Sequence, residues 1–305
     1  MKSLIDYSSK FRILKGGKVS LVVSAMLSSA TLSFASPTEG TISSGSVTIS
    51  QNGSITTINQ STSKASINWQ SFNIGVNETV NFNQPSSSSI TLNRVTGASN
   101  SLIQGVMNAN GQVFLINPNG VLFSQGSQVN VSGLIATTKN LSDSDFNNDN
   151  FVFDGNSQQS IVNKGTINAN NGYVALLGQS VSNEGTILAT LGTVELAGGK
   201  RFLLNTNGNS LVNLTIDEAT LNSLVENKGL IKADGGKVHL TTKAINSILD
   251  GMVNNTGIIE AQTLSQNEKG EIVLFAHGGT ANIDGTLDAS FVETSGDKVK
   301  IEETT

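Results

Sequence analysis

Val162-Asn163-Lys164-Gly165-Thr166-Ile167-Asn168-Ala169 is a stretch that the chain repeats four more times. Each copy has an Asn shortly before a Gly, a short aliphatic or β-branched run after the Gly, and a final Ala; the later copies cover 181–189, 225–233, 253–261 and 282–289. Internal repeats spaced by roughly 20 to 50 residues indicate a solenoid. One such unit is too thin to bury its own apolar side, so the copies must stack to form a continuous core.

Most copies are followed by a second run with strand character. These runs are Tyr173–Leu177, Thr193–Leu196, Lys237–Leu240 and Glu271–Phe275. We therefore expect each coil to contain several short strands joined by polar turns. Phe291–Glu293 and Lys298–Ile301 are predicted as further strands, which leads us to expect that the chain continues into a longer protein.

The composition fits many short strands. The chain has 305 residues, of which 13% are charged and 5% aromatic, with 31 Gly and no Cys. Its length would allow two domains, but the unbroken repeat favours one elongated solenoid. The lack of Cys excludes thiol catalysis. It suits a chain that stays unfolded in an oxidising compartment and then crosses a second pore, and it equally suits a solenoid that needs no disulfide.

Residues 1–35 are predicted to be a secretory signal peptide. Five basic residues precede the apolar run Val19–Leu27, and Ser33-Phe34-Ala35 is a small-x-small site that predicts cleavage between Ala35 and Ser36. A membrane anchor is the alternative, but this run is shorter than the ~20 apolar residues that a span needs. The general secretory translocon is therefore an expected partner.

Charge argues against nucleic acid as a partner. The full chain has 18 basic and 23 acidic residues; removing the five basic and one acidic residue of the signal leaves 13 and 22, a net charge of −9. No basic patch remains to attract phosphate backbones.

Two segments of the mature chain are expected to differ from regular coils. An N-terminal cap over 36–75 should cover the first coil, because an open end exposes core and unpaired strand edges; coils and insertions then fill 76–305. Thr215–Glu218 has the capping-box pattern T-x-x-E, and Leu221, Leu224 and Val225 follow at helical spacing. A short inserted helix is predicted there, whereas 141–150 is predicted as an acidic, Asn-rich loop.

Five blocks carry a family resemblance. They are Asn68–Gly75, Asn81–Ser89, Leu92–Val95, Gly111–Phe123 and Val129–Thr138. Together they resemble the haemagglutination-activity domain, the N-terminal secretion domain of two-partner-secretion exoproteins such as filamentous haemagglutinin and the high-molecular-weight adhesins. The resemblance runs from about Gly40 to the end. Asn117-Pro118-Asn119-Gly120 matches the family's NPNG motif, whereas its NPNL motif has no clear copy, since Asn213-Leu214 is half a match at another place.

The resemblance implies an all-β fold, a right-handed parallel β-helix with an N-terminal cap and extra-helical elements. It also implies a function: the domain directs a large adhesin through the periplasm of a Gram-negative bacterium to a cognate outer-membrane β-barrel transporter with POTRA domains. The exoprotein would reach the cell surface and bind a host-cell receptor or glycan through downstream regions. The alternative is that the same domain heads a haemolysin or a contact-dependent growth-inhibition toxin.

Residues Asn117–Gly120 form a predicted turn between two apolar strands, because Pro fixes φ and Asn-Gly tolerates positive φ. The motif either shapes a corner of a coil or contacts the transporter directly. The residues leave both roles open.

A third reading is a β-helical carbohydrate-active enzyme, which would need clustered carboxylates with a basic group or a metal. Asp284 and Asp288 flank a turn of the repeat and are expected to be solvated. His239 alternates with apolar neighbours and should point outward, and His277 precedes two Gly at a strand end. We therefore expect no catalytic residue, metal or cofactor, and not an enzyme.

Overall fold

The computed structural model describes residues 35–243, 251–265 and 268–302. Apart from Ala35, the predicted signal peptide lies outside the described residues. Within them the chain forms 29 strands and one short helix, and that helix is not long and apolar enough to cross a membrane. Ser36, the first residue of the predicted mature chain, is buried, and its Oγ accepts a hydrogen bond from Gln51 Nε2 at 3.2 Å.

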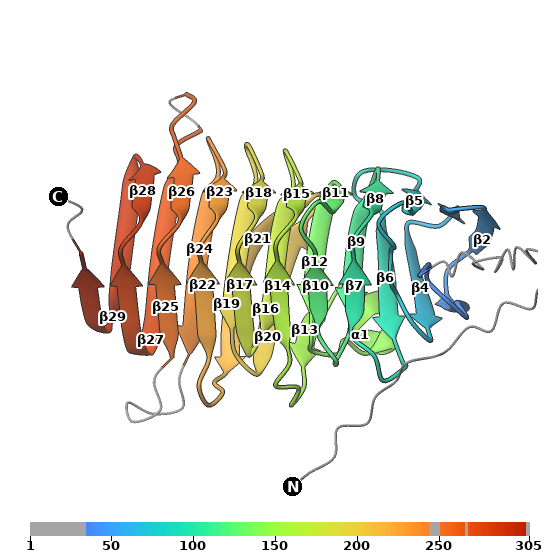
Figure 1. The fold of residues 1–305 in the computed structure, drawn as a ribbon, viewed down its shortest axis with the longest axis horizontal. Coiled ribbons are helices and arrows are strands. Elements are labelled where there is room, and N and C mark those ends of the chain that lie inside the picture. Colours follow the sequence, from blue (N-terminus) through green and yellow to red (C-terminus); the bar gives the residue numbers. More distant parts are fainter. Residues whose placement is uncertain (1–34, 244–250, 266–267, 303–305) are drawn as a thin grey trace, which may run out of the picture. The chain divides into compact units, whose positions relative to one another are not determined.

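The strands of successive coils stack into three faces, which we call A, B and C (Figure 1). Face A contains β4 (Lys64–Trp69), β6 (Ile90–Val95), β9 (Gln112–Ile116), β12 (Gly133–Thr137), β16 (Tyr173–Gly178), β19 (Thr193–Gly198), β24 (Lys237–Lys243) and the first half of β27 (Glu271–Ile283). Face B contains β7 (Ser101–Ile103), β10 (Val121–Phe123), β14 (Ser160–Asn163), β17 (Ser180–Asn183), β22 (Leu224–Asn227), β25 (Met252–Asn255) and the second half of β27. Face C contains β3 (Ile55–Gln60), β5 (Thr79–Asn83), β8 (Val106–Ala109), β11 (Gln128–Asn130), β15 (Thr166–Asn168), β18 (Thr186–Leu188), β23 (Leu230–Lys232), β26 (Ile258–Ala261) and β28 (Thr286–Ala289).

Neighbouring strands within each face are parallel and paired in register, for example Ile161 with Val181 and Ile167 with Ile187. β29 (Phe291–Ile301) continues this pairing against β27. The described chain is therefore a parallel β-helix, and the predicted solenoid is confirmed. The predicted second strands are confirmed as parts of β16, β19, β24 and β27, and the two strands expected near the C-terminal end lie within β29.

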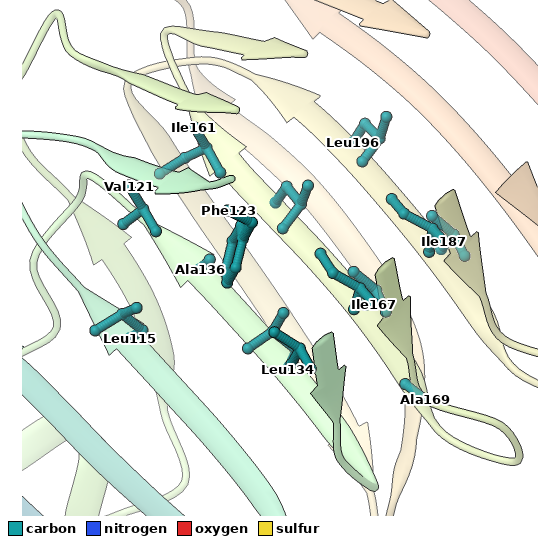
Figure 2. Close-up of a cluster of buried hydrophobic side chains, with 14 of the residues drawn as sticks. Leu115, Val121, Phe123, Leu134, Ala136, Ile161, Ile167, Ala169, Ile187 and Leu196 are labelled. Carbon is teal, nitrogen blue, oxygen red and sulfur yellow. The ribbon is translucent and has the colours of Figure 1, made fainter. Parts of the chain in front are cut away.

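The interior of the coils is one continuous apolar core. Because side chains alternate along a strand, every second residue of each short strand points inward. Figure 2 shows Val121 and Phe123 on face B converging with Leu134 on face A and Ile167 on face C. Full burial of such a side chain contributes about 1.5–3 kcal/mol, so each coil gains stability mainly from the coils that it contacts.

The repeated Asn and Gly have distinct structural reasons. Asn163, Asn183, Asn227 and Asn255 form a buried ladder in which each Nδ2 donates to the next Oδ1 at 2.8 Å. The Gly two positions later lets consecutive turns pack closely, since a Cβ added at Gly229 would clash with the carbonyl oxygen of Gly185. The repeat of the sequence is thus a repeat of contacts between coils.

Antiparallel strands cover the N-terminal end of the stack. β1 (Thr41–Ser44) pairs with β4, and β2 (Val47–Asn52) pairs with β3. β3 and β4 also pair in parallel with the next coil, so the cap and the β-helix share them. Trp69 is buried beneath this end, where its Nε1 donates to Asn93 Oδ1 at 3.0 Å.

A second, smaller core lies outside face A. It is covered by an antiparallel sheet of β13 (Phe151–Asp154), β20 (Arg201–Asn207) and β21 (Ser210–Glu218), and by the helix α1 (Asp143–Asn147). Six of its 17 buried residues are aromatic, and Phe114 of face A contacts the rings of Phe146, Phe151 and Phe153. These elements are the extra-helical part of the fold.

The predicted inserted helix is wrong. Thr215–Glu218 is the end of β21, which pairs antiparallel with β20 and buries Leu211 and Ile216 in the second core. Leu224 and Val225 belong to β22, in parallel register with β17. A capping-box match is a weak local signal, and burial of the β20–β21 hairpin outweighs it.

The loop predicted at 141–150 instead contains α1. Ser142 caps this helix by accepting a hydrogen bond from Asp145 N at 3.0 Å, and Phe146 is buried. Its single buried aromatic residue explains why no helical periodicity shows in the sequence.

Candidate recognition surface around the Asn117–Gly120 turn

The turn Asn117–Gly120 joins β9 to β10 and takes the chain from face A to face B. Gly120 N donates to Asn117 O at 3.0 Å, which closes a β-turn. Gly120 has φ of 101°, a conformation that L-residues rarely adopt. Gly is therefore strongly favoured at the end of this turn, where a side chain would strain the backbone.

Asn117 is fully buried and braces the turn from inside. Its Nδ2 donates to Ser99 O and Ser101 Oγ, each at 3.0 Å, and its Oδ1 accepts from Asn119 N at 2.9 Å. Pro118 is exposed and Asn119 is half-buried. The motif thus has two buried residues that shape the corner and two residues that a partner can touch.

An open groove of about 650 Å³ lies beside the turn on the outer side of face B. Leu122 and Val162 are register partners on β10 and β14, and both point outward, away from the core residues Val121, Phe123 and Ile161 that Figure 2 shows inside. Amide and hydroxyl groups rim the groove; they come from Ser99, Asn100, Asn119, Gln159 and Ser160.

The segment 155–159, here called the wall, returns the chain from β13 to β14, lines the groove through Gln159 and lies against the turn. Ser157 Oγ donates to Pro118 O at 2.5 Å and accepts from Gln159 N at 3.2 Å. A Cβ added at Gly120 would lie 3.1 Å from Ser160 O, so the wall and the turn approach closely. Residues far apart in the sequence therefore line one groove.

An ion pair closes the far end of the groove. Lys164 Nζ lies 2.9 Å from Glu184 Oε2, and both side chains are partly exposed. The hydrogen bond from Lys164 is the main cause that lowers the pKa of Glu184, so this carboxylate stays ionised at neutral pH. An apolar floor with a polar rim and fixed charges at one end suits a polypeptide partner.

The other residues weighed in the sequence lie apart from this surface and from one another. Asp284 and Asp288 are both exposed, on a turn and on β28. His277 is exposed beside Phe275. Asn213-Leu214 lies within β21. In the three described ranges no group of three or more His, Asp and Glu is placed to hold a metal ion.

His239 has contacts that the sequence did not suggest. It points away from the core, as predicted, but its Nδ1 lies 2.7 Å from Oε1 of Glu195 on the preceding coil, and its Nε2 lies 3.7 Å from Glu271 Oε1 on the next. The signal that could have found this pair is the alignment of repeat copies, which places His239 in register with Glu195.

Residues 33–289 match the family model of the TPS (two-partner-secretion) secretion domain. Among curated proteins, the chain is 37% identical over 299 residues to a heme/hemopexin-binding protein of Haemophilus influenzae strain Rd, covering 93% of this chain and 32% of the relative. A second heme/hemopexin-binding protein of Haemophilus influenzae is 37% identical over 265 residues, covering 79% and 28%. The chain thus spans about a third or less of the length of these relatives.

Two solved secretion domains match the chain. The HMW1 secretion domain from Haemophilus influenzae matches with a TM-score of 0.78 and 31% identity, covering 87% of this chain and 72% of that one. The filamentous hemagglutinin secretion domain matches with a TM-score of 0.49 and 15% identity, covering 88% and 99%.

Proposed function

Because the chain belongs to the TPS secretion domain family, we propose that the groove and the exposed half of the Asn117–Gly120 turn, here called the recognition surface, bind the cognate outer-membrane transporter. Proteins headed by this domain are secreted across the outer membrane to the cell surface, and the domain directs that export. The single observation that carries the docking proposal is the two-sided turn, whose buried Asn117 and Gly120 hold Pro118 and Asn119 at the edge of a groove.

The chemistry of the recognition surface supports a protein partner. Leu122 and Val162 supply apolar area that is half-buried in the described chain, and burial against a partner would remove it from water at about 25 cal/mol per Å². The amide rim offers donors and acceptors that a polypeptide backbone matches. A hydrogen bond from Ser157 Oγ to Pro118 O ties the wall to the turn, so little ordering is needed on binding.

The route and the wider partners follow as parts of the same proposal. The chain enters the periplasm through the general secretory translocon, meets the POTRA domains of the transporter, and acts without catalysis. The exoprotein that the domain heads is an adhesin that binds a receptor on the host. The names of the two Haemophilus influenzae relatives support a second candidate, in which the exoprotein binds heme or hemopexin.

The test of docking is Val162→Glu, which places a charge on the groove floor and leaves the inward face of β14 unchanged. We expect transporter-dependent release into the medium to fall about tenfold, because desolvating an unpaired charge opposes binding, while the thermal midpoint of the purified chain stays the same. Met252→Glu is the matched control, since Met252 is exposed on the same face but outside the groove.

The possible outcomes distinguish an error in the proposed function from an error in the proposed docking site. If wild-type chain reaches the medium equally without the transporter, the proposed function is wrong. If release needs the transporter but Val162→Glu leaves it unchanged, the recognition surface lies elsewhere. Asn117→Ala/Gly120→Val should lower both stability and release, because these two residues form the corner itself.

A further inference from the structure

We propose that Lys139 is a positioning residue for the recognition surface: it holds the segment 155–159 from beneath, so that this wall stays against the turn. The inference rests on the proposed docking function. Lys139 follows β12, and its side chain is among the largest that are fully buried. Its Nζ donates to the carbonyl oxygens of Gly155 at 3.0 Å and Ser157 at 2.8 Å.

Ser157 connects the ammonium to the turn. Its carbonyl oxygen accepts from Lys139, its Oγ donates to Pro118 O, and the same Oγ accepts from Gln159 N. Gln159 also lines the groove. One residue therefore joins the buried ammonium, the exposed half of the turn and the groove wall, and a change at Lys139 reaches the surface through three hydrogen bonds.

A buried lysine is a costly way to hold a fold together. Both hydrogen-bond partners of Nζ are carbonyl oxygens rather than carboxylates. Burial lowers the pKa of Lys139 to about 8; the charge of Asp154 opposes this effect and that of Lys200 adds to it. Burying a charged group has a desolvation cost that an apolar side chain of similar volume does not have. Gly155 and Ser157 are half-buried, so water can replace the ammonium at this segment, and stability alone does not explain a lysine here.

The decisive variant is Lys139→Met, tested in the whole 305-residue chain with its transporter. We expect transporter-dependent release to fall about tenfold, as for loss of a binding contact, while the thermal midpoint at pH 7 is unchanged or higher. Lys237→Met is the control, because Lys237 is an exposed lysine that pairs with Glu271 on face A. Ser157→Ala should also lower release, and Lys139→Met/Ser157→Ala should be no worse than the stronger single variant.

A second measurement reports on the wall directly. Because the chain has no Cys, Gln159→Cys can carry a single spin label. We expect the mobility of this label to increase in Lys139→Met and to stay the same in Lys237→Met. A label whose mobility is unaffected by Lys139→Met would overturn the inference.

Two further results would overturn it. One is normal release of Lys139→Met while Val162→Glu is defective, which leaves the docking proposal intact. The other is a fall in midpoint that accounts for the loss of release, which would make Lys139 structural. If Lys139→Met and Val162→Glu are both released normally, and release still requires the transporter, then both the proposed recognition surface and the positioning role of Lys139 are wrong.

Discussion

Single asparagines within the coils carry much of the specificity of stacking. Asn227 accepts from Asn183 and donates to Asn255, each at 2.8 Å, in a fully buried position. Its neighbours in the ladder lie at equivalent positions, so the amide nitrogen of one asparagine donates to the amide oxygen of the next. An amide missing from this row would leave polar groups buried without partners, which is more costly than a hydrogen bond lost to water.

We predict that Asn227→Ala destabilises the folded chain by about 2–4 kcal/mol, since it removes both ladder bonds of Asn227, leaves the buried Asn255 Oδ1 without its donor and creates a cavity. Urea unfolding of the purified chain measures this free energy. Asn282→Ala is the matched control: Asn282 donates to Asn254 on the outer side, where water replaces the lost bond, and we expect about 0.5 kcal/mol or less. Equal losses for both variants would contradict a role of burial in the ladder.

His239 makes the stacking of three coils sensitive to pH. Burial disfavours the protonated ring, but the hydrogen bond and charge of Glu195 and the charge of Glu271 outweigh it and raise the pKa of His239; Lys237 slightly opposes them. The folded state therefore holds the proton more tightly than the unfolded chain, whose histidine pKa is about 6.5. The stabilisation that protonated His239 contributes is therefore complete below about pH 6.5 and is lost as pH rises through the pKa of His239 in the folded state.

We predict that the stabilisation contributed by His239, measured as the difference in the free energy of unfolding between the wild type and His239→Gln, falls as pH rises from about 6.5 through the folded pKa of His239. His239→Gln is the reference, because glutamine keeps a hydrogen-bond donor for Glu195 but does not titrate. Urea unfolding at a series of pH values from about 5 to 9 measures the difference between the two chains. A difference that is constant with pH would contradict this prediction.

The strands of the coils could be predicted from the sequence, whereas the strands and the helix outside the coils could not. The strands of the coils recur with Gly and Asn at fixed places, so one correct copy predicts the rest. The β20–β21 hairpin occurs once, and its burial depends on Phe114 and other face A residues remote in sequence. Local spacing at Thr215–Val225 therefore indicated a helix, and α1 had too little periodicity to be seen.

The candidate site divides in the same way. The turn at Asn117–Gly120 was predictable, because Pro and Gly restrict its backbone. The groove was not, since the wall at 155–159 arrives from an extra-helical strand that only the fold places there. The buried role of Lys139 was equally hidden, because a lysine after a strand usually points to solvent.

The separation of the two cores makes a prediction for the extra-helical sheet. Phe202 on β20 is fully buried in the second core and is not part of the coil interior. Phe202→Ala should cost about 3–5 kcal/mol locally, and hydrogen exchange should accelerate in β13, β20 and β21 while amides of β14–β19 on faces B and C keep their protection. Uniform loss of protection across the coils would show that the two cores unfold as one unit.

The chain as a whole is organised so that each coil is completed by the one before it. Backbone pairing and burial link a coil chiefly to its neighbours, as in other solenoids, where folding can begin at one end and propagate. The antiparallel cap covers the coil that would emerge first. Progressive stacking outside the cell would then bias an extended chain outward without a nucleotide energy source, which requires the chain to be unlocked when it enters the transporter.

A disulfide that locks two coils before export tests this idea. Thr166 and Thr186 are register partners on the outer side of face C, and neighbouring strands lie about 4.8 Å apart, within the range for a disulfide. In Thr166→Cys/Thr186→Cys, oxidation closes a loop in a chain that otherwise has no Cys. We expect the oxidised protein to accumulate in the periplasm and release to recover when reductant is added during synthesis. Each single-Cys variant should be released normally, because it can form no internal bridge. Release of the closed chain at the wild-type rate would mean that the transporter accepts folded coils, and stacking at the surface would then not be what drives export.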